Sequence, residues 1–105
     1  MKEIKAVIQP GKLQKIRDAL DALPDFPGMS VSRTEGCSSH EHRTSQPSTR
    51  QELTEFSPKT RIEIVAPDEI APQIVQLIRE LAHTGRPGDG VVWVTTVEKF
   101  CRIRE

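Results

Sequence analysis

The chain has 105 residues, of which 35% are apolar and 29% charged, as is typical of one folded domain with a modest core. Fifteen Lys and Arg side chains balance fifteen Asp and Glu side chains, so no net field draws the chain to nucleic acid or to an anionic membrane. No stretch approaches the roughly 20 apolar residues of a membrane helix, and strand-like alternation from the first residues leaves no room for a signal peptide. Two cysteines are too few for a disulfide framework. We therefore expect one cytoplasmic domain over residues 1–105, without a nucleic-acid partner and without membrane insertion.

The first third of the chain carries two strand patterns and one helix pattern. Residues 3–9 alternate apolar and polar side chains, which predicts a half-buried strand. Over residues 13–23, apolar side chains recur every three or four positions, which predicts an amphipathic helix. Prolines and a glycine at 24–28 indicate a turn, and a second short strand is expected at 29–33.

The remainder of the chain opens with a long polar stretch. From Thr34 to about Pro58 no apolar periodicity is present, and a loop of this length in a compact domain is usually functional or disordered. We expect it to be mobile. Alternation returns at 59–66 and predicts a third strand. An apolar stripe then predicts a second helix, which begins near Pro72, and residues 91–96 predict a fourth strand.

Three glycines and one proline lie between the second helix and the last strand, in HTGRPGDG at residues 83–90. This density excludes the interior of a helix or strand. A glycine-rich loop also lets backbone N–H groups approach an anion closely, because no Cβ intervenes. Thr84 and Arg86 add a hydroxyl donor and a positive charge. The alternative is a tight turn with no ligand, and the loop by itself does not decide between the two.

The order strand, helix, strand, long loop, strand, helix, strand indicates an α+β, ferredoxin-like split βαβ fold (βαββαβ). It has a four-stranded antiparallel sheet with two helices on one face. Right-handed crossovers are expected to bring the first and fourth strands to the middle of the sheet. The other face of the sheet would be left open, and among its charges it carries Lys5, Val7, Val65, Val91 and Trp93.

Four stretches occur in order along the chain, and a basic pair follows them. The stretches are MKEIKAVIQP at 1–10, GMSV at 28–31, PKTRIEIV at 58–65 and TGRPGDG at 84–90; the basic pair is Arg102 and Arg104. Together they resemble the PII signal-transduction proteins, a family of trimeric nucleotide sensors. The similarity covers nearly the whole chain except the polar stretch at about 34–58, which corresponds to the family's T-loop. Residues 84–90 correspond to its B-loop.

The resemblance implies a homotrimer with an adenine nucleotide in each cleft between subunits. The B-loop would direct backbone donors at the phosphates, and the basic pair would add charge, since arginine binds phosphate oxygens bidentately. Residues 28–30 would contact the base and ribose from one side, and residues 64 and 65 from the other. The implied nucleotide-binding residues are Gly28, Met29, Ser30, Gly36, Cys37, Ser38, Lys59, Ile64, Val65, Thr84, Gly88, Asp89, Gly90, Arg102 and Arg104.

The chain also departs from the family's pattern at charged positions. Val91 stands where a lysine usually follows the B-loop, Ser39 where an arginine meets phosphate, and His40 where a glutamine helps to place magnesium and 2-oxoglutarate. The chain has no tyrosine, so it cannot be uridylylated on one. These differences imply a divergent member that favours ADP or AMP over ATP, of the kinds associated with inorganic carbon, carboxysomes or transporters. The alternatives are a nitrogen-regulatory protein that senses ATP and 2-oxoglutarate, or a regulator of a transporter.

The expected function is therefore non-enzymatic signalling to an unidentified target protein through the T-loop. An enzyme is not expected, because the sequence shows neither a Ser/His/Asp set nor a Cys-Arg phosphatase loop. No cofactor is expected either. A small anion, bicarbonate in the first instance, would have Ser39, His40 and Lys59 as neighbours. Cys37 with His40 and His42 suits a transition metal, but loop composition explains these residues better, and we expect no metal site. Cys37 and Cys101 are expected to be inert thiols rather than a redox pair.

Overall fold

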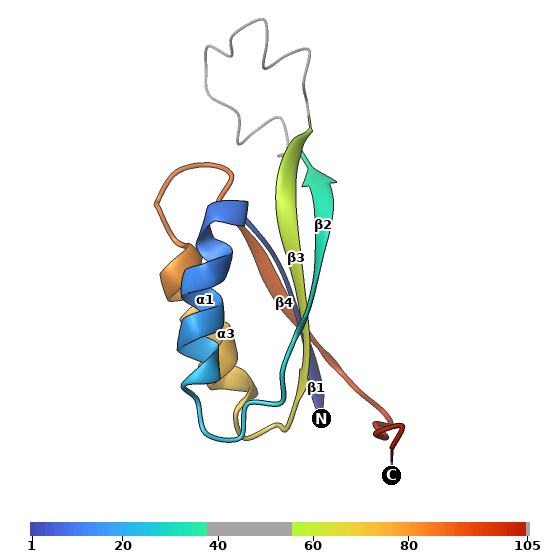
Figure 1. Cartoon of the computed structure of the whole chain (residues 1–105). Helices are drawn as coiled ribbons and strands as arrows, with labels where there is room; N and C mark the ends of the chain where they lie inside the picture. Colours follow the sequence, from blue (N-terminus) through green and yellow to red (C-terminus); the bar gives the residue numbers. More distant parts are fainter. Residues whose placement is uncertain (38–55, 105) are drawn as a thin grey trace, which may run out of the picture.

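The computed structural model describes residues 1–37 and 56–104, which form one antiparallel sheet covered on one face by two helices (Figure 1). This confirms the ferredoxin-like α+β fold. The elements in chain order are β1 (Lys2–Ile8), the 3₁₀ turn η1 (Pro10–Lys12), α1 (Leu13–Asp21), β2 (Ser30–Gly36), β3 (Ser57–Ala66), α3 (Ala71–Ala82) and β4 (Gly90–Thr96).

The strand order is β2-β3-β1-β4, so the first and third strands are central. The expectation that the first and fourth strands lie in the middle was wrong. Each βαβ crossover leaves a gap one strand wide between its two parallel strands, and the central strand of the other unit fills that gap. β4 is therefore an edge strand, as is β2. In the register of the three strands β3, β1 and β4, Ile4 lies opposite Ile64 on one side and Val94 on the other.

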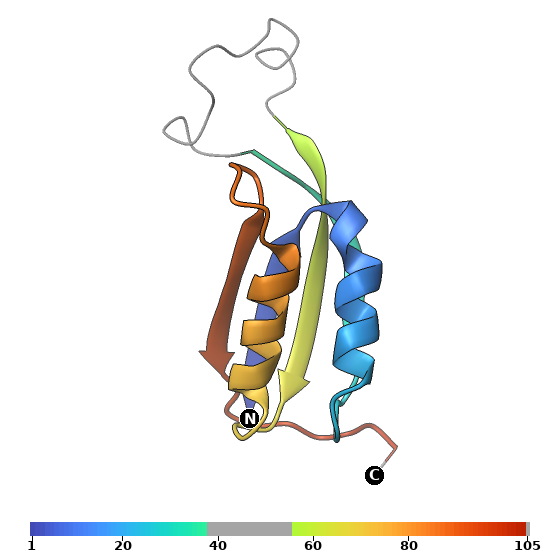
Figure 2. The same ribbon diagram turned by 90° about the vertical axis from the view of Figure 1, so that its left-hand side faces the viewer.

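The core lies between the sheet and the two helices, which run side by side across one face (Figure 2). Alternate residues of the central strands point into it, and each fully buried Ile or Leu contributes about 1.5–3 kcal/mol by leaving water. The fully buried large side chains are Ile4, Ile8, Ile16, Leu20, Ile62, Ile64, Ile74 and Ile78. The apolar sides predicted for the two helices thus both face the sheet.

Prolines set the helix boundaries. Pro10 begins the 3₁₀ turn that leads into α1, and Pro72 lies in the first turn of α3, where its missing N–H costs nothing. α1 ends at Asp21, two residues before Leu23, because a residue preceding proline disfavours helical backbone angles. Leu23 instead donates its N–H to Leu20 O at 3.0 Å and still packs on the core.

The strands that flank the T-loop are longer than the sequence indicates. Thr34, Glu35 and Gly36 pair with Lys59, Pro58 and Ser57, so the loop boundaries of 34 and 58 were wrong. These residues are polar and give no apolar signal, but backbone pairing across the hairpin does not depend on side-chain hydropathy. The predicted mobility of the loop falls mainly on residues 38–55, which lie outside the described residues.

The sheet face turned away from the helices carries a mixture of apolar and charged side chains, and we call it the open face. It comprises Glu3, Lys5 and Val7 of β1, Arg61, Glu63 and Val65 of β3, and Val91 and Trp93 of β4. Val91 is 60% exposed and Trp93 39%. No helix among the described residues is long and apolar enough to cross a membrane.

Candidate functional site

Asp89 organises the B-loop, residues 84–90. Its carboxylate accepts hydrogen bonds from Thr84 N at 2.7 Å, from Gly85 N at 3.0 Å and from the Thr84 hydroxyl. Thr84 Oγ1 in turn accepts from Arg86 N at 3.2 Å. Gly85 and Gly88 have φ angles of +84° and +94°, which glycine adopts without strain. The loop therefore owes its shape to one carboxylate and one hydroxyl.

Hydrogen bonding from the Thr84 hydroxyl, and then from Thr84 N, lowers the pKa of Asp89 from 3.8 to about 2. A lowered pKa means that the folded loop favours the charged carboxylate. The contribution of Asp89 to stability is therefore fully present above pH 3.8 and is lost as the pH falls through about 2.

We expect amide hydrogen exchange at Thr84 and Gly85 to accelerate, relative to the core, as the pH is lowered from about 4 toward 2. Asp89→Asn should remove this dependence, because its amide keeps the shape of the side chain but carries no charge to lose. The loop should then exchange faster at pH 6 as well. Asp18→Asn, which alters an exposed carboxylate on α1, serves as the control. If Asp89→Asn protected the two amides as well as the unmodified chain does, the charge of Asp89 would not organise the loop.

The B-loop is also tied to the two central strands through the carbonyl of Gly88. Gln9 Nε2 donates to Gly88 O at 2.7 Å, and Lys59 Nζ donates to it at 2.9 Å. Lys59 thus connects the strand that leaves the T-loop directly to the B-loop. An ammonium group has three N–H donors, so two remain for an anion. Gln9 was not among the predicted site residues. Beyond its place before Pro10, no sequence feature indicates a role for Gln9.

Gly90 must be glycine because of the strand beside it. Its φ is +113°, and a Cβ built on it would lie 1.9 Å from Val7 O. The close approach lets β4 leave the B-loop directly into its pairing with β1, where Gly90 lies opposite Ile8.

The predicted site residues form two groups at opposite ends of the sheet, and we name these ends for what they carry (Figure 1). The B-loop end holds Gly36, Cys37, Lys59, Thr84, Gly88, Asp89 and Gly90. The arm end holds Gly28, Met29, Ser30, Ile64 and Val65, together with the segment 97–104 that follows β4, which we call the arm. Ser38, Ser39 and His40 lie outside the described residues.

Arg102 and Arg104 are exposed on the arm and do not reach the B-loop of their own chain. Val97 N donates to Met1 O at 3.1 Å, which holds the start of the arm at the far end of β4. The seven residues of β4 separate it from the B-loop by about 20 Å. The Arg102 guanidinium instead lies 5.6 Å from the centre of the Phe100 ring.

The residues expected to contact the base differ in how accessible they are to a ligand. Ile64 as a whole is 1% exposed, so within one chain it offers no surface to a base. Val65 lies on the open face, and Met29 packs partly against the core. Gly28 has a φ of +106° at the entry to β2.

The structure bears on the redox pair and the metal site considered from the sequence, within the residues that it describes. Cys37 and Cys101 are both free and exposed, at the B-loop end and on the arm respectively, so they do not share a cleft within one chain. Residues 1–37 and 56–104 hold no group of three or more His, Cys, Asp or Glu side chains that suits a metal ion. His40 and His42 are outside these ranges.

Comparison with known proteins decides the family. The model of the family described as nitrogen regulatory protein P-II matches residues 1–105. The chain belongs to the P-II family. It is 36% identical over 104 residues to the nitrogen regulatory protein P-II of Azospirillum brasilense and 38% identical to nitrogen regulatory protein P-II 1 of Escherichia coli K12. In each case the match covers 99% of this chain and 92% of the relative.

Membership makes this chain a PII signalling protein and supports nitrogen regulation as its setting.

Proposed function

We propose that this PII protein is a non-enzymatic regulator that binds an adenine nucleotide between copies of a homotrimer and signals it to a target protein through the T-loop. The observation that carries the proposal is the division of the phosphate-binding groups. The glycine loop lies at one end of the sheet, and β4 leads to the Arg102/Arg104 pair at the other. One anion can contact both only if the B-loop end of one copy meets the arm of the next.

Such a contact is heterologous, because it joins two different surfaces, and it closes into a ring when the rotation between copies permits. The open face supports burial against other copies. It combines exposed Val91 and Trp93 with charges. The buried Arg61 Nε there forms an ion pair with Glu63 Oε1 at 3.1 Å but donates a hydrogen bond to no described residue. A neighbouring copy would supply the missing acceptor.

The B-loop has groups available for phosphate. The N–H groups of Thr84, Gly85 and Arg86 are engaged inside the loop. Those of Gly88 and Asp89 donate to no described residue, and Lys59 Nζ lies beside them. Backbone donors next to a lysine are a common arrangement for binding phosphate oxygens.

The test is isothermal calorimetry of ADP with the whole chain. We expect binding, and we expect Arg102→Ala to weaken it about tenfold, since a hydrogen bond to a charged group contributes about 1.5–3 kcal/mol. Arg17→Ala on α1, whose side chain is also exposed, is the control and should bind ADP normally. Absence of ADP binding, or equal loss in the two variants, would contradict the proposal.

The assembly is tested separately. Light scattering at micromolar concentration should give about three times the 11.8 kDa mass of the chain. Asp89→Ala and Arg102→Ala chains are mixed in equal amounts, unfolded and refolded together. Random assembly then places an intact B-loop beside an intact arm at about a quarter of the sites, so about a quarter of the normal ADP binding should return. No recovery in mixed trimers would show that both groups belong to one chain.

The names of the relatives favour nitrogen regulation as the setting, so sensing of 2-oxoglutarate together with ATP is the second candidate function. Calorimetry of the nucleotide with and without 2-oxoglutarate distinguishes the two. The inorganic-carbon and transporter roles rest on resemblance alone, and two of the three proposed bicarbonate neighbours, Ser39 and His40, lie outside the described residues. Nucleotide turnover by the purified protein would contradict the non-enzymatic assignment.

A further inference from the structure

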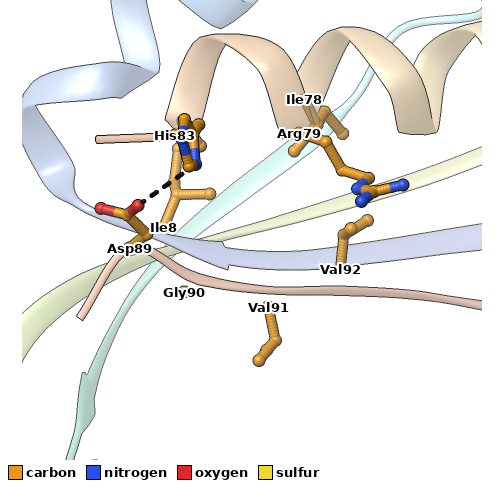
Figure 3. A pocket seen from close by; sticks show the side chains of 9 residues that line it. Ile8, Ile78, Arg79, His83, Asp89, Gly90, Val91 and Val92 are labelled. Carbon is orange, nitrogen blue, oxygen red and sulfur yellow. Dashed lines mark ion pairs between the residues drawn. The ribbon is translucent and has the colours of Figure 1, made fainter. Parts of the chain in front are cut away.

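A pocket of about 270 Å³ lies on the helix side of β4, behind the B-loop (Figure 3). The last two turns of α3 form one wall, and the first half of β4 forms the other. The lining residues are Ile8, Ile78, Arg79, Ala82, His83, Asp89, Gly90, Val91 and Val92. The pocket is open on one side because β4 is an edge strand with no strand beyond it.

The floor of the pocket is apolar. Ile8 and Ile78 are each 1% exposed and belong to the core, and Val92 packs partly against it. Val94, the next residue on the same side of β4, is 42% exposed and continues this surface along the strand. A ligand that covers the floor would remove apolar area from water.

A cation lies at the rim of this floor. Arg79 extends from α3 over Val92, at the end of the pocket away from Asp89 (Figure 3). Among residues 1–37 and 56–104, no carboxylate lies within 4.0 Å of its guanidinium. Asp89 does not pair with it, since both oxygens of that carboxylate accept bonds from Thr84 and Gly85, and the ring nitrogen beside the carboxylate is His83 Nδ1 at 3.8 Å.

We propose that this pocket binds a small monocarboxylate with an apolar body. The carboxylate would pair with the Arg79 guanidinium, whose planar donors match two oxygens, and the body would cover Ile78, Ala82 and Val92. A monoanion fits better than a phosphate ester, because one arginine faces the head group and the charge of Asp89 at the other end of the pocket opposes a second negative charge.

This site adjoins the proposed nucleotide cleft, because Asp89, Gly90 and Val91 line the pocket, but its apolar floor and its cation lie on the helix side of the sheet. Val7, Val65 and Val91 of the open face point to the opposite side of the sheet from Ile8, Ile78 and Val92. The two proposals share the B-loop, but the pocket depends on Arg79, Ile78 and Val92, which the nucleotide proposal does not use, so hexanoate would bind if no nucleotide did.

The test is a titration of the whole ¹⁵N-labelled chain with hexanoate, followed by amide chemical shifts. We expect saturable shifts at Ile78, Ala82 and Val92 with a dissociation constant of about millimolar, as suits a ligand of this size. Arg79→Gln should weaken binding about five- to tenfold, and Arg79→Lys should weaken it less, because charge is kept and the planar fork is lost. Hexanol, with the same apolar body and no charge, should bind as weakly to the unmodified chain as hexanoate does to Arg79→Gln.

The matched control is Arg17→Gln, which removes an exposed arginine from the other helix and should leave hexanoate binding unchanged. Arg79 is exposed, so its variants should fold, and thermal unfolding of each variant checks this. Shifts that fail to saturate at tens of millimolar, equal binding of hexanol and hexanoate, or an equal loss in the Arg17 variant would each overturn the proposal.

Discussion

Replacing Gly90 with alanine is expected to lower the free energy of unfolding by at least about 4 kcal/mol, the largest effect expected from a Gly→Ala change at any of the six glycines. Two independent costs combine at this position. The φ of +113° is unfavourable for every residue with a Cβ. The added Cβ would also overlap Val7 O at 1.9 Å, and a backbone oxygen inside a sheet cannot move aside as a flexible side chain can.

The control for this change is Gly11→Ala. A Cβ at Gly11 meets nothing within 4 Å, and its φ lies outside the left-handed region, so stability should change by less than about 1 kcal/mol. Gly88→Ala should lie between the two, because its φ is +94° but its nearest neighbour is the end of the Gln9 side chain at 3.4 Å. Urea unfolding of the three variants measures the differences. A Gly90→Ala chain as stable as Gly11→Ala would show that β4 does not leave the loop as described.

ATP is expected to bind this protein no more tightly than ADP, and Val91→Lys to strengthen ATP binding by about tenfold or more. This expectation rests on the proposed nucleotide cleft. Val91 directly follows the B-loop and is 60% exposed in the single chain, so a lysine there displaces no side chain of the core. Its ammonium would reach the outer phosphates, where an added positive charge favours three phosphates over two.

Val94→Lys supplies the matched control, since it adds the same charge to the same strand but on the helix side, where Val94 is 42% exposed. It should leave the ratio of ATP to ADP affinity unchanged in calorimetry. If the unmodified protein bound ATP at least tenfold more tightly than ADP, the loss of cations at Val91 and Ser39 would not govern selectivity.

Part of the candidate site could be predicted from residue types alone. Thr84, Gly85, Gly88 and Gly90 predicted a glycine-dense loop before the last strand, and the resemblance to the PII B-loop then favoured a phosphate site over a plain turn. The inward bonds of Asp89 and the contact of Gln9 with Gly88 could not be predicted, since each depends on which side chain faces which backbone atom. The Arg79 pocket was missed for the same reason: on the sequence, Arg79 is an ordinary polar position on an amphipathic helix.

The sequence by itself determined the order of strands and helices, and the face that β1, β3 and the two helices bury. Apolar spacing of two places Ile4 and Ile62 on one side of a strand, and spacing of three and four places Ile74 and Ile78 on one side of a helix, and both are local properties of the chain. Only the tertiary structure decided that β1 and β3 are central, since strand order depends on how two crossovers interlock. It also decided that the B-loop and Arg102 lie at opposite ends of the sheet, because the direction of β4 carries the chain away from the loop.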